Sequence, residues 1–327
     1  MGIKARNFKS VLVTGGAGFV GSNLVRKLLP ISEKVIIVDN LATGRYSNLK
    51  DILNQEKIDF KLCDIGNYKQ IEQIMKTNQI EYIFHQAALS SVPRSFADPL
   101  ATNRANITGT LNLLQLARIS SVKKFVFASS SSVYGNSKKL PKSEDMKTIP
   151  LSPYAASKLS CELYAEIYNN NNFVSTTGLR YFNVFGPYQD PNSQYSAVIP
   201  IFIKNALLNK DITIFGDGNQ SRDFTYVDNV CQANINAALS TDSNGCSLNI
   251  SLGNRLSIRN LAEIIIEQLN SKSKIVFTKK RLGDVKHSIA DISLAKKLIN
   301  YEPRILFEDG IEKTIKYFKN LFEVAQN

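Results

Sequence analysis

The fold of this chain is decided near its N-terminus, by residues 11–21, which read VLVTGGAGFVG. The apolar run predicts a short buried strand, and the pattern over residues 19–29, stopped by Pro30, predicts a helix. The glycines between them, spaced G-x-x-G-x-x-G, permit a tight turn and close backbone approach to a ligand. A strand that enters a helix through such a turn predicts a phosphate site at the helix N-terminus.

Outward from this stretch, short β-branched and aromatic runs alternate with longer helical patterns. We predict strands at residues 11–13, 34–38, 59–62, 82–84, 125–127 and 176–184, and helices at 19–29, 68–77, 99–119 and 154–170. This alternation indicates crossover connections and a parallel sheet covered on both faces. The expected fold class is therefore α/β, a Rossmann-type doubly wound parallel sheet.

The pattern loosens beyond residue 184, where prolines mark a long loop region. Helical patterns return at 197–208, 227–239, 258–269, 292–299 and 310–322. We predict a nucleotide-binding domain at residues 1–184, to which residues 227–250 return. Residues 185–226 and 251–327 then form a smaller, irregular α/β lobe that binds substrate at the C-terminal edge of the sheet.

Composition excludes several classes of protein. The chain has 327 residues, 43% of them apolar, with no stretch that predicts a membrane span or a signal peptide. Its four widely spaced cysteines favour reduced thiols and a cytoplasmic location. With only two histidines, we expect no metal site. The net charge of +12 favours either nucleic acid and membrane phosphates or an anionic small substrate.

Asp39 points to the identity of a dinucleotide. It stands at the end of the second predicted strand, where a carboxylate accepts hydrogen bonds from both ribose hydroxyls. A carboxylate there repels a 2′-phosphate, and the next residue is Asn40 rather than arginine. We therefore expect NAD rather than NADP. In the alternative interpretation, Asp39 only caps the following loop and the glycines form an ordinary turn.

Tyr154 and Lys158 stand at positions i and i+4 of a predicted helix and so share one face. A nearby ammonium favours the phenolate form of a tyrosine, which is otherwise a poor base. The serine run at residues 129–132 ends a predicted buried strand, where hydroxyls point into the ligand crevice. A surface helix pair and a solvated loop are the alternatives. A serine hydrolase is disfavoured because G-x-S-x-G is missing.

Eight motifs in order resemble those of the extended short-chain dehydrogenase/reductases, and within them the nucleotide-sugar 4-epimerases. They are Thr14 to Gly21, Asp39-Asn40, His85 to Ala88, Ser129 to Gly135, Ser152-Pro153-Tyr154 with Lys158, Leu179 to Val184, Gly216-Asp217-Gly218 with Arg222-Asp223-Phe224, and Arg281 to Asp284.

That resemblance implies a set of NAD contacts. Gly15, Gly18, Phe19 and Val20 would hold the pyrophosphate, and Asp39, Asn40, Thr43 and Gly44 the adenosine ribose. Asp64 and Ile65 would flank adenine, and the remaining contacts, toward the nicotinamide, would be Gln86, Ala87, Ala88, Asn106, Tyr154, Lys158, Tyr181 and Phe182.

The implied reaction is a reversible oxidation at C4 of a sugar. Tyr154 takes the hydroxyl proton while hydride passes to NAD, and the 4-keto sugar then turns and accepts hydride on its other face. Ser130 bonds the same oxygen, with Ser131 as the alternative serine, and Lys158 binds the nicotinamide ribose and lowers the Tyr154 pKa. Ser131-Ser132 stands where the related dehydratases carry an Asp-Glu pair, so elimination would lose its acid and base.

The resemblance also implies substrate contacts. Arg222, Arg281 and Asn183 would bind a diphosphate, Ala197, Val198, Thr213 and Phe215 uridine, Asp284 its ribose, and Ser90, Ser91, Arg94, Ser130, Ser131, Ser132 and Ser288 the sugar. A small residue at 288 would leave room for an N-acetyl group. We therefore expect interconversion of UDP-GlcNAc and UDP-GalNAc.

Several alternatives stay open. One is a UDP-glucose 4-epimerase, and another is a UDP-N-acetyl-uronate 4-epimerase, for which Arg94 would matter. A catalytically silent NAD-binding regulatory module is the non-enzyme alternative. The family further implies a homodimer through residues 99–119 and 154–170, and supply of polysaccharide precursors. Scattered lysines account for much of the positive charge, so we expect neither nucleic acid nor a membrane as partner.

Overall fold

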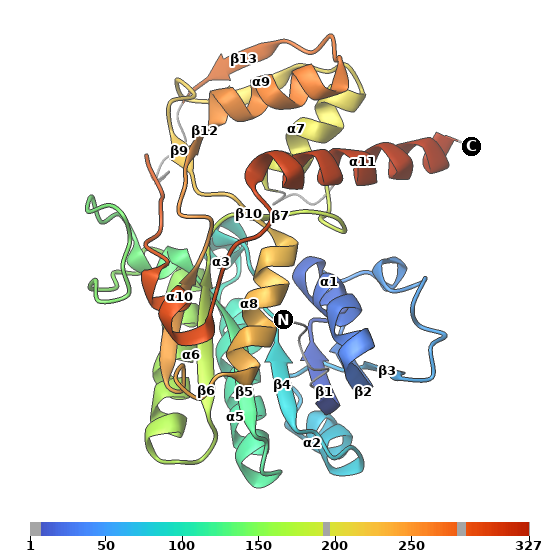
Figure 1. Cartoon of the computed structure of the whole chain (residues 1–327), viewed down its shortest axis with the longest axis vertical. Helices are drawn as coiled ribbons and strands as arrows, with labels where there is room; N and C mark the ends of the chain where they lie inside the picture. The colour runs from blue at the N-terminus through green and yellow to red at the C-terminus, as the bar shows by residue number, and fades with distance from the viewer. Residues whose placement is uncertain (1–7, 192–196, 280–285, 327) are drawn as a thin grey trace.

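A seven-stranded parallel sheet forms the centre of the computed structural model, which describes residues 8–191, 197–279 and 286–326 (Figure 1). The strand order is β11-β6-β5-β4-β1-β2-β3. The strands are β1 (Phe8–Thr14), β2 (Ser32–Asp39), β3 (Ile58–Leu62), β4 (Tyr82–His85), β5 (Lys124–Ser130), β6 (Thr176–Tyr181) and β11 (Cys246–Ile250). The doubly wound α/β fold predicted from the sequence is confirmed.

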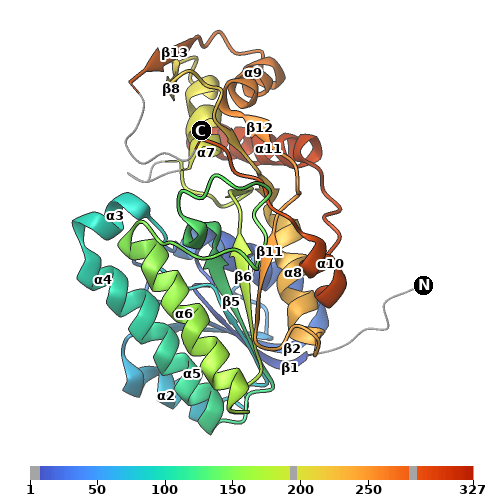
Figure 2. The ribbon, with the colours of Figure 1, turned by 90° about the vertical axis from the view of Figure 1, so that its left-hand side faces the viewer.

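Helices cover both faces of the sheet (Figure 2). One face carries α1 (Phe19–Leu28), α8 (Val227–Leu239) and α10 (Ser293–Ile299), and the other α2 (Tyr68–Thr77), α5 (Gly109–Ile119) and α6 (Pro153–Asn170). The alternation of side chains along β1 separates two cores: Val11 and Val13 pack in one, and Leu12 in the other. The unbroken apolar run at residues 11–13 of β1 is thereby explained, because each of its side chains is buried on one face or the other.

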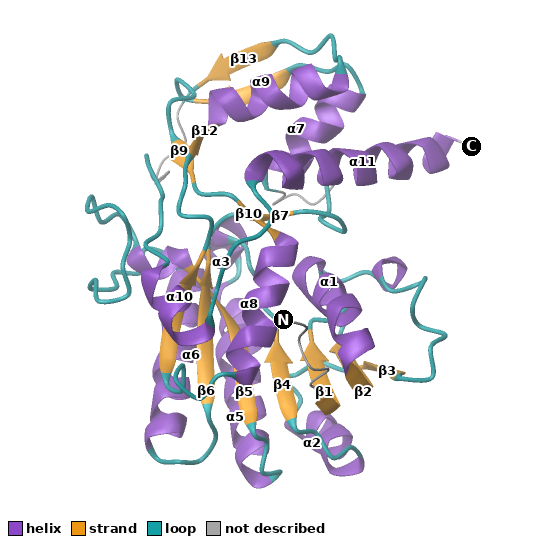
Figure 3. Ribbon diagram, in the orientation of Figure 1, coloured by secondary structure: helices purple, strands orange, loops and turns teal. Residues whose placement is uncertain are grey.

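The lobe lies beyond the C-terminal ends of the strands, where ligands bind in open α/β sheets (Figure 3). It contains α7 (Val198–Leu207), α9 (Ile258–Leu269), α11 (Phe307–Gln326) and three two-stranded sheets. Their strands are β7 (Val184–Phe185) with β10 (Thr225–Tyr226), β8 (Ile212–Phe215) with β13 (Ile275–Thr278), and β9 (Ser221–Arg222) with β12 (Leu256–Ser257).

One hydrophobic core is continuous from the sheet into the lobe. It joins Val13 and Leu24 near the glycine turn to Phe185, Phe224 and Phe318. Strand β11 and helix α8 belong to the sheet side, next to β6 and α1 respectively. The predicted division into a nucleotide domain and a lobe stays a prediction.

The predicted helix at 99–119 is interrupted. It consists of α4 (Pro99–Asn103), a π-helical turn (Arg104–Thr108) and α5. The predicted strand at 176–184 ends at Tyr181, because Asn183 has a positive φ of 34°. The sequence analysis missed α3 (Val92–Ala97), whose start is marked by the Ser91 side chain accepting a hydrogen bond from the backbone N–H of Arg94.

Short 3₁₀ turns also occur at Leu29–Ile31, Tyr46–Asn48 and Ser131–Tyr134. Within the described ranges, every helix is too short or too polar to cross a bilayer.

Candidate active site

The turn between β1 and α1 can be made only by glycine. Gly15 has φ +68°, and a Cβ there would lie 2.6 Å from the backbone nitrogen of Ala87. A Cβ on Gly21 would lie 2.0 Å from the Gly15 carbonyl oxygen. No side chain caps the N-terminus of α1, so its first N–H groups are available to an anion. The turn therefore has the backbone geometry and the N–H groups that the predicted pyrophosphate site requires.

Asp39 lies beside this turn at the end of β2. Its two carboxylate oxygens accept hydrogen bonds from the backbone N–H groups of Ala17, at 3.0 Å, and Leu41, at 2.8 Å. Burial raises the pKa of Asp39, and these two hydrogen bonds oppose the shift. A Cβ on Gly44 would lie 2.8 Å from both oxygens. Asp39 thus fixes the following loop and also lines the cavity, so the capping and binding interpretations agree with the same geometry.

A cavity of about 700 Å³ extends from the glycine turn to the lobe. It brings together most of the predicted NAD contacts, namely Gly15, Gly18, Phe19, Val20, Asp39, Asn40, Thr43, Asp64, Ile65, Gln86, Ala87, Ala88, Tyr154, Lys158 and Tyr181. Of the predicted substrate contacts it includes Ser90, Ser130, Ser131, Ser132, Asn183 and Ala197. The functional roles of these residues stay predictions.

Other predicted site residues do not line this cavity. They are Gly44, Asn106 and Phe182 among the NAD contacts, and Ser91, Arg94, Val198, Thr213, Phe215, Arg222 and Ser288 among the substrate contacts. Arg281 and Asp284 lie outside the described residues.

Asn106 lies behind the cavity wall. Its side chain accepts a hydrogen bond from the Leu89 backbone N–H at 2.8 Å and donates to the Ser157 hydroxyl at 2.9 Å. The side chain is buried, so Asn106 shapes the loop that carries Ser90 and Ala88 rather than facing the cavity.

Tyr154 begins α6 and lies against Ser130, the last residue of β5. Pro153 stands in the first turn of α6, and the Ser152 side chain caps it, which fixes where the helix starts. Burial raises the pKa of Tyr154, and the hydrogen bond with the Ser130 side chain opposes that shift. Ser130, Ser131 and Tyr154 all line the cavity, and the choice of Ser130 over Ser131 as the catalytic serine stays a prediction.

Lys158 lies one helical turn after Tyr154 and is buried. Its ammonium donates a hydrogen bond to the carbonyl oxygen of Ala128 at 2.7 Å. Burial lowers the pKa of Lys158, and the charges of Cys161 and Glu162 oppose the shift. We expected Lys158 to lower the Tyr154 pKa. Burial raises that pKa in this structure, and the expected effect of Lys158 on it stays a prediction.

The predicted NAD contacts Gln86 and Tyr181 form a triangle of hydrogen bonds with Asn234, which the sequence analysis missed. The Tyr181 hydroxyl donates to Gln86 Oε1 at 3.0 Å, Gln86 Nε2 donates to Asn234 Oδ1 at 2.9 Å, and Asn234 Nδ2 donates to the Tyr181 hydroxyl at 2.8 Å. The signal was Asn234, a polar residue on the buried face of the predicted helix at 227–239. The triangle holds Gln86 and Tyr181 in the cavity wall.

His85 supports the site from within the sheet. Its ring nitrogens lie 2.7 Å from the Thr14 hydroxyl and 2.8 Å from the Thr110 hydroxyl. Burial, with the Lys158 charge as a second cause, lowers the pKa of His85 from 6.5 to about 3. The ring is therefore neutral at physiological pH.

This neutral histidine predicts a loss of stability in acid. Between pH 6.5 and about 3 the unfolded chain takes up a proton at His85 that the folded chain does not. The free energy of unfolding should fall by up to about 1.4 kcal/mol per pH unit from this group as the pH drops. Denaturant unfolding from pH 7 to pH 4 measures the slope. It should be smaller in His85→Gln and largely retained in His287→Gln, and equal slopes in all three proteins would contradict the assignment.

Comparison with known proteins places the chain among nucleotide-sugar epimerases. Residues 11–252 match the model of the NAD dependent epimerase/dehydratase family. The UDP-glucose 4-epimerase of Mycolicibacterium smegmatis is 36% identical over 310 residues, covering 94% of this chain and 98% of that protein. The UDP-glucuronate 4-epimerase of Thermodesulfobacterium geofontis is 38% identical over 325 residues, covering 97% and 98%.

The fold is also similar to that of a solved epimerase whose name gives a third sugar. The UDP-N-acetylglucosamine 4-epimerase from Methanobrevibacter ruminantium M1, in complex with UDP-N-acetylmuramic acid, superimposes with a TM-score of 0.91. It is 41% identical, and the match covers 96% of this chain and 99% of that chain. These relatives agree on 4-epimerisation and differ in the sugar.

Proposed function

We propose, from the premise that the chain belongs to the NAD-dependent epimerase/dehydratase family, that this nucleotide-sugar 4-epimerase interconverts UDP-GlcNAc and UDP-GalNAc. The observation that carries the proposal is that Ser130, Tyr154 and Lys158 line the same cavity as the glycine turn. In this proposal, NAD and the sugar nucleotide share the cavity, and the Ser130 and Tyr154 hydroxyls face the reacting carbon.

Each residue has a role that its chemistry supports. NAD, when bound, supplies a hydride acceptor. The Tyr154 phenol oxygen would take the proton of the sugar 4-hydroxyl, and the Ser130 hydroxyl would hydrogen-bond the same oxygen. The glycine turn and Asp39 would fix the pyrophosphate and the ribose, because no Cβ obstructs the turn and the carboxylate lies beside it.

The positions of the carboxylates in the cavity favour epimerisation over elimination. Among the described residues that line the cavity, Asp39 and Asp64 are the only acids. Asp39 ends β2 and Asp64 follows β3, whereas Tyr154 lies on α6. Ser131 and Ser132 line the cavity next to Ser130, where an eliminating enzyme would need an acid and a base. The site therefore suits removal and return of a hydride at one carbon.

Two features support the N-acetylated sugar. The 41% identical structure has UDP-N-acetylglucosamine 4-epimerase in its name. Ser288 is small, and its backbone N–H donates to the Ser221 carbonyl at 3.1 Å, which places it beside Arg222, our proposed diphosphate contact. UDP-glucose and an N-acetylated uronate are the alternatives, and Arg94, at the start of α3, is the residue that would favour the uronate.

A coupled assay of the purified protein on UDP-GlcNAc, UDP-glucose and UDP-GlcNAcA tests the substrate. We expect UDP-GlcNAc to have the highest kcat/KM. Ser288→Tyr should lower turnover of UDP-GlcNAc at least about tenfold and that of UDP-glucose much less, because the added ring competes with the acetyl group for space. A variant that slows both sugars alike would remove Ser288 from the specificity pocket. A protein that binds NAD and epimerises none of the three would instead be the regulatory module.

We also propose a homodimer formed through α3, α4 and α6. Phe96 and Leu100 are 62% and 81% exposed, and Leu163 and Ile167 on the adjacent α6 are each 53% exposed. Leu159 packs against the core, so the apolar stripe of α6 serves the monomer at one end only. An exposed apolar face of this kind marks an interaction surface. Light scattering should give twice the mass of the chain.

The proposed setting is the cytoplasm, with the product supplied to polysaccharide synthesis. All four cysteines are free, in keeping with reduced thiols, and three of them are buried.

A further inference from the structure

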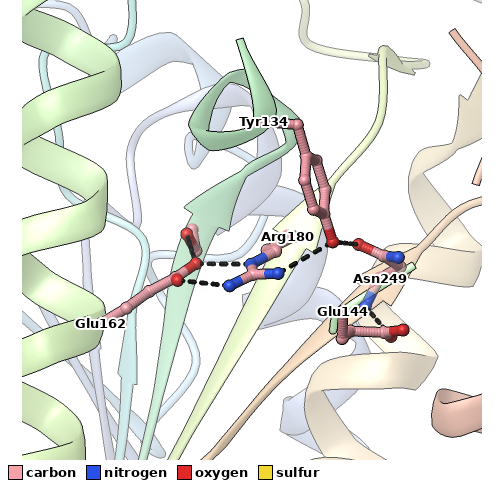
Figure 4. A network of polar contacts seen from close by, with 6 residues as sticks. Tyr134, Glu144, Glu162, Arg180 and Asn249 are labelled. Carbon is pink, nitrogen blue, oxygen red and sulfur yellow. Dashed lines mark hydrogen bonds and ion pairs between the residues drawn. The ribbon is translucent and has the colours of Figure 1, made fainter. Parts of the chain in front are cut away.

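A buried ion pair lies directly behind the serine run. Glu162 on α6 and Arg180 on β6 form a bidentate pair, with Arg180 Nε and Nη2 at 2.9 and 2.8 Å from the two carboxylate oxygens (Figure 4). Each residue is 7% exposed. The two contacts outweigh the effect of burial and raise the pKa of Arg180. Neither residue lines the cavity, so the pair does not bind substrate or NAD directly.

The ion pair forms hydrogen bonds with the chain both before and after the serine run. Before the run, the Ser129 hydroxyl donates to Glu162 Oε1 at 2.5 Å. After it, Arg180 Nη1 donates to the Tyr134 hydroxyl at 2.8 Å, and this hydroxyl donates to Asn249 Oδ1 at 2.7 Å. The residues between these two attachment points are Ser130, Ser131, Ser132 and Val133, and the three serines line the cavity.

The register of the sheet explains why one pair reaches both points. Ser129 on β5 is the direct partner of Arg180 on β6, so both side chains leave the sheet together. Glu162 lies two helical turns after Tyr154 and one after Lys158, on the same buried face of α6. The end of β5 and helix α6 are thus joined at the residue next to Ser130.

We propose that Glu162 and Arg180 are positioning residues that hold the serine run as a clamp and set the place of the Ser130 hydroxyl against the Tyr154 phenol. This inference rests on the proposed function, because it assigns Ser130 and Tyr154 to the reacting centre. A buried ion pair adds little to folding stability, because the free-energy cost of desolvating the two charges offsets much of their attraction. A pair of apolar residues would fill the same space, but the Ser129 hydroxyl would lose its acceptor Glu162 and the Tyr134 hydroxyl would lose its donor Arg180.

Glu162→Gln tests the clamp with a side chain of the same shape. It leaves Arg180 as a buried cation without its carboxylate. We expect kcat to fall about 10- to 100-fold, since a misplacement of about 1 Å in a reacting group can have that effect. The KM for the UDP-sugar and the NAD content of the purified protein should stay unchanged. Glu166→Gln, an exposed position one turn further along α6, is the matched control and should match the wild type.

A double variant separates positioning from simple stabilisation. Glu162→Met combined with Arg180→Met removes both charges, and its unfolding midpoint should recover toward the wild-type value. Its kcat should stay low, because the run is no longer held. Recovery of kcat together with the midpoint would overturn the proposal and leave the pair as a structural element. Ser129→Ala removes one attachment point only and should lower kcat by a smaller factor in a fully folded protein.

Crystal structures of wild type and Glu162→Gln with NAD bound give a readout that needs no substrate. The Ser130 hydroxyl should be displaced from the Tyr154 phenol in the variant, and an unchanged position would overturn the clamp. Wild-type turnover of the UDP-sugars tests the proposed function separately, so either idea can fail without the other.

Discussion

Replacement of Tyr154 by phenylalanine should reduce turnover of every UDP-sugar by about 100- to 10,000-fold, because general acid-base catalysis by one group contributes on that order. The variant removes only the hydroxyl, and the ring keeps its place in the wall of the cavity. The NAD content of the purified protein, measured after denaturation, should therefore equal that of the wild type. Single-turnover reduction of bound NAD by a UDP-sugar isolates the affected step.

Tyr168→Phe is the matched control for that experiment. It lies on the same helix, and its hydroxyl bonds Gln115 at 3.1 Å instead of reaching the cavity. Its turnover should stay near the wild-type rate. If Tyr154→Phe keeps most of its activity while Ser130→Ala loses it, the proton acceptor is a different group.

The second large effect is expected from Gly21→Ala. The added methyl group would lie 2.0 Å from the Gly15 carbonyl oxygen, a contact that only movement of the backbone can relieve. Forced packing of this kind costs about 1–3 kcal/mol. Movement of α1 away from the turn would also remove the N–H groups that face the pyrophosphate. We expect purified Gly21→Ala to contain little NAD and to unfold at a lower denaturant concentration.

Gly66→Ala provides the comparison. A Cβ there would meet the ends of the Asp64 and Arg104 side chains at 3.1 and 3.3 Å, and both can move. This variant should keep its NAD and most of its stability. Wild-type NAD content in Gly21→Ala would mean that the turn tolerates a side chain and is no cradle for the cofactor.

The sheet was predictable because its central strands contain short runs of apolar residues. Val11, Leu12 and Val13 illustrate this, since each serves one of two cores and none needs to be polar. Strand β11 was harder to assign because Asn249 is polar and yet buried. It is satisfied by contacts with Tyr134 and other groups that are distant in sequence.

In the candidate site too, some residues could be predicted from local sequence patterns and others depend on partners that are distant in sequence. Tyr154 and the glycines were found because their chemistry requires a fixed spacing along the chain. Glu162 and Arg180 were missed because charged residues are mostly exposed, and no spacing rule links a helix position to its partner on a distant strand. The π-helical turn at residues 104–108 was hidden because its sequence keeps a helical pattern.

The continuous core between sheet and lobe has a consequence for how the enzyme admits its substrate. Phe185, Phe224 and Phe318 belong to the same apolar cluster as Val13, so the two parts share one hydrophobic core. Rotation of the lobe as a rigid body would separate these packed side chains and expose apolar surface to water, which is unfavourable. Entry of a sugar nucleotide therefore depends on local loop movement, and heat should melt both parts in a single cooperative transition.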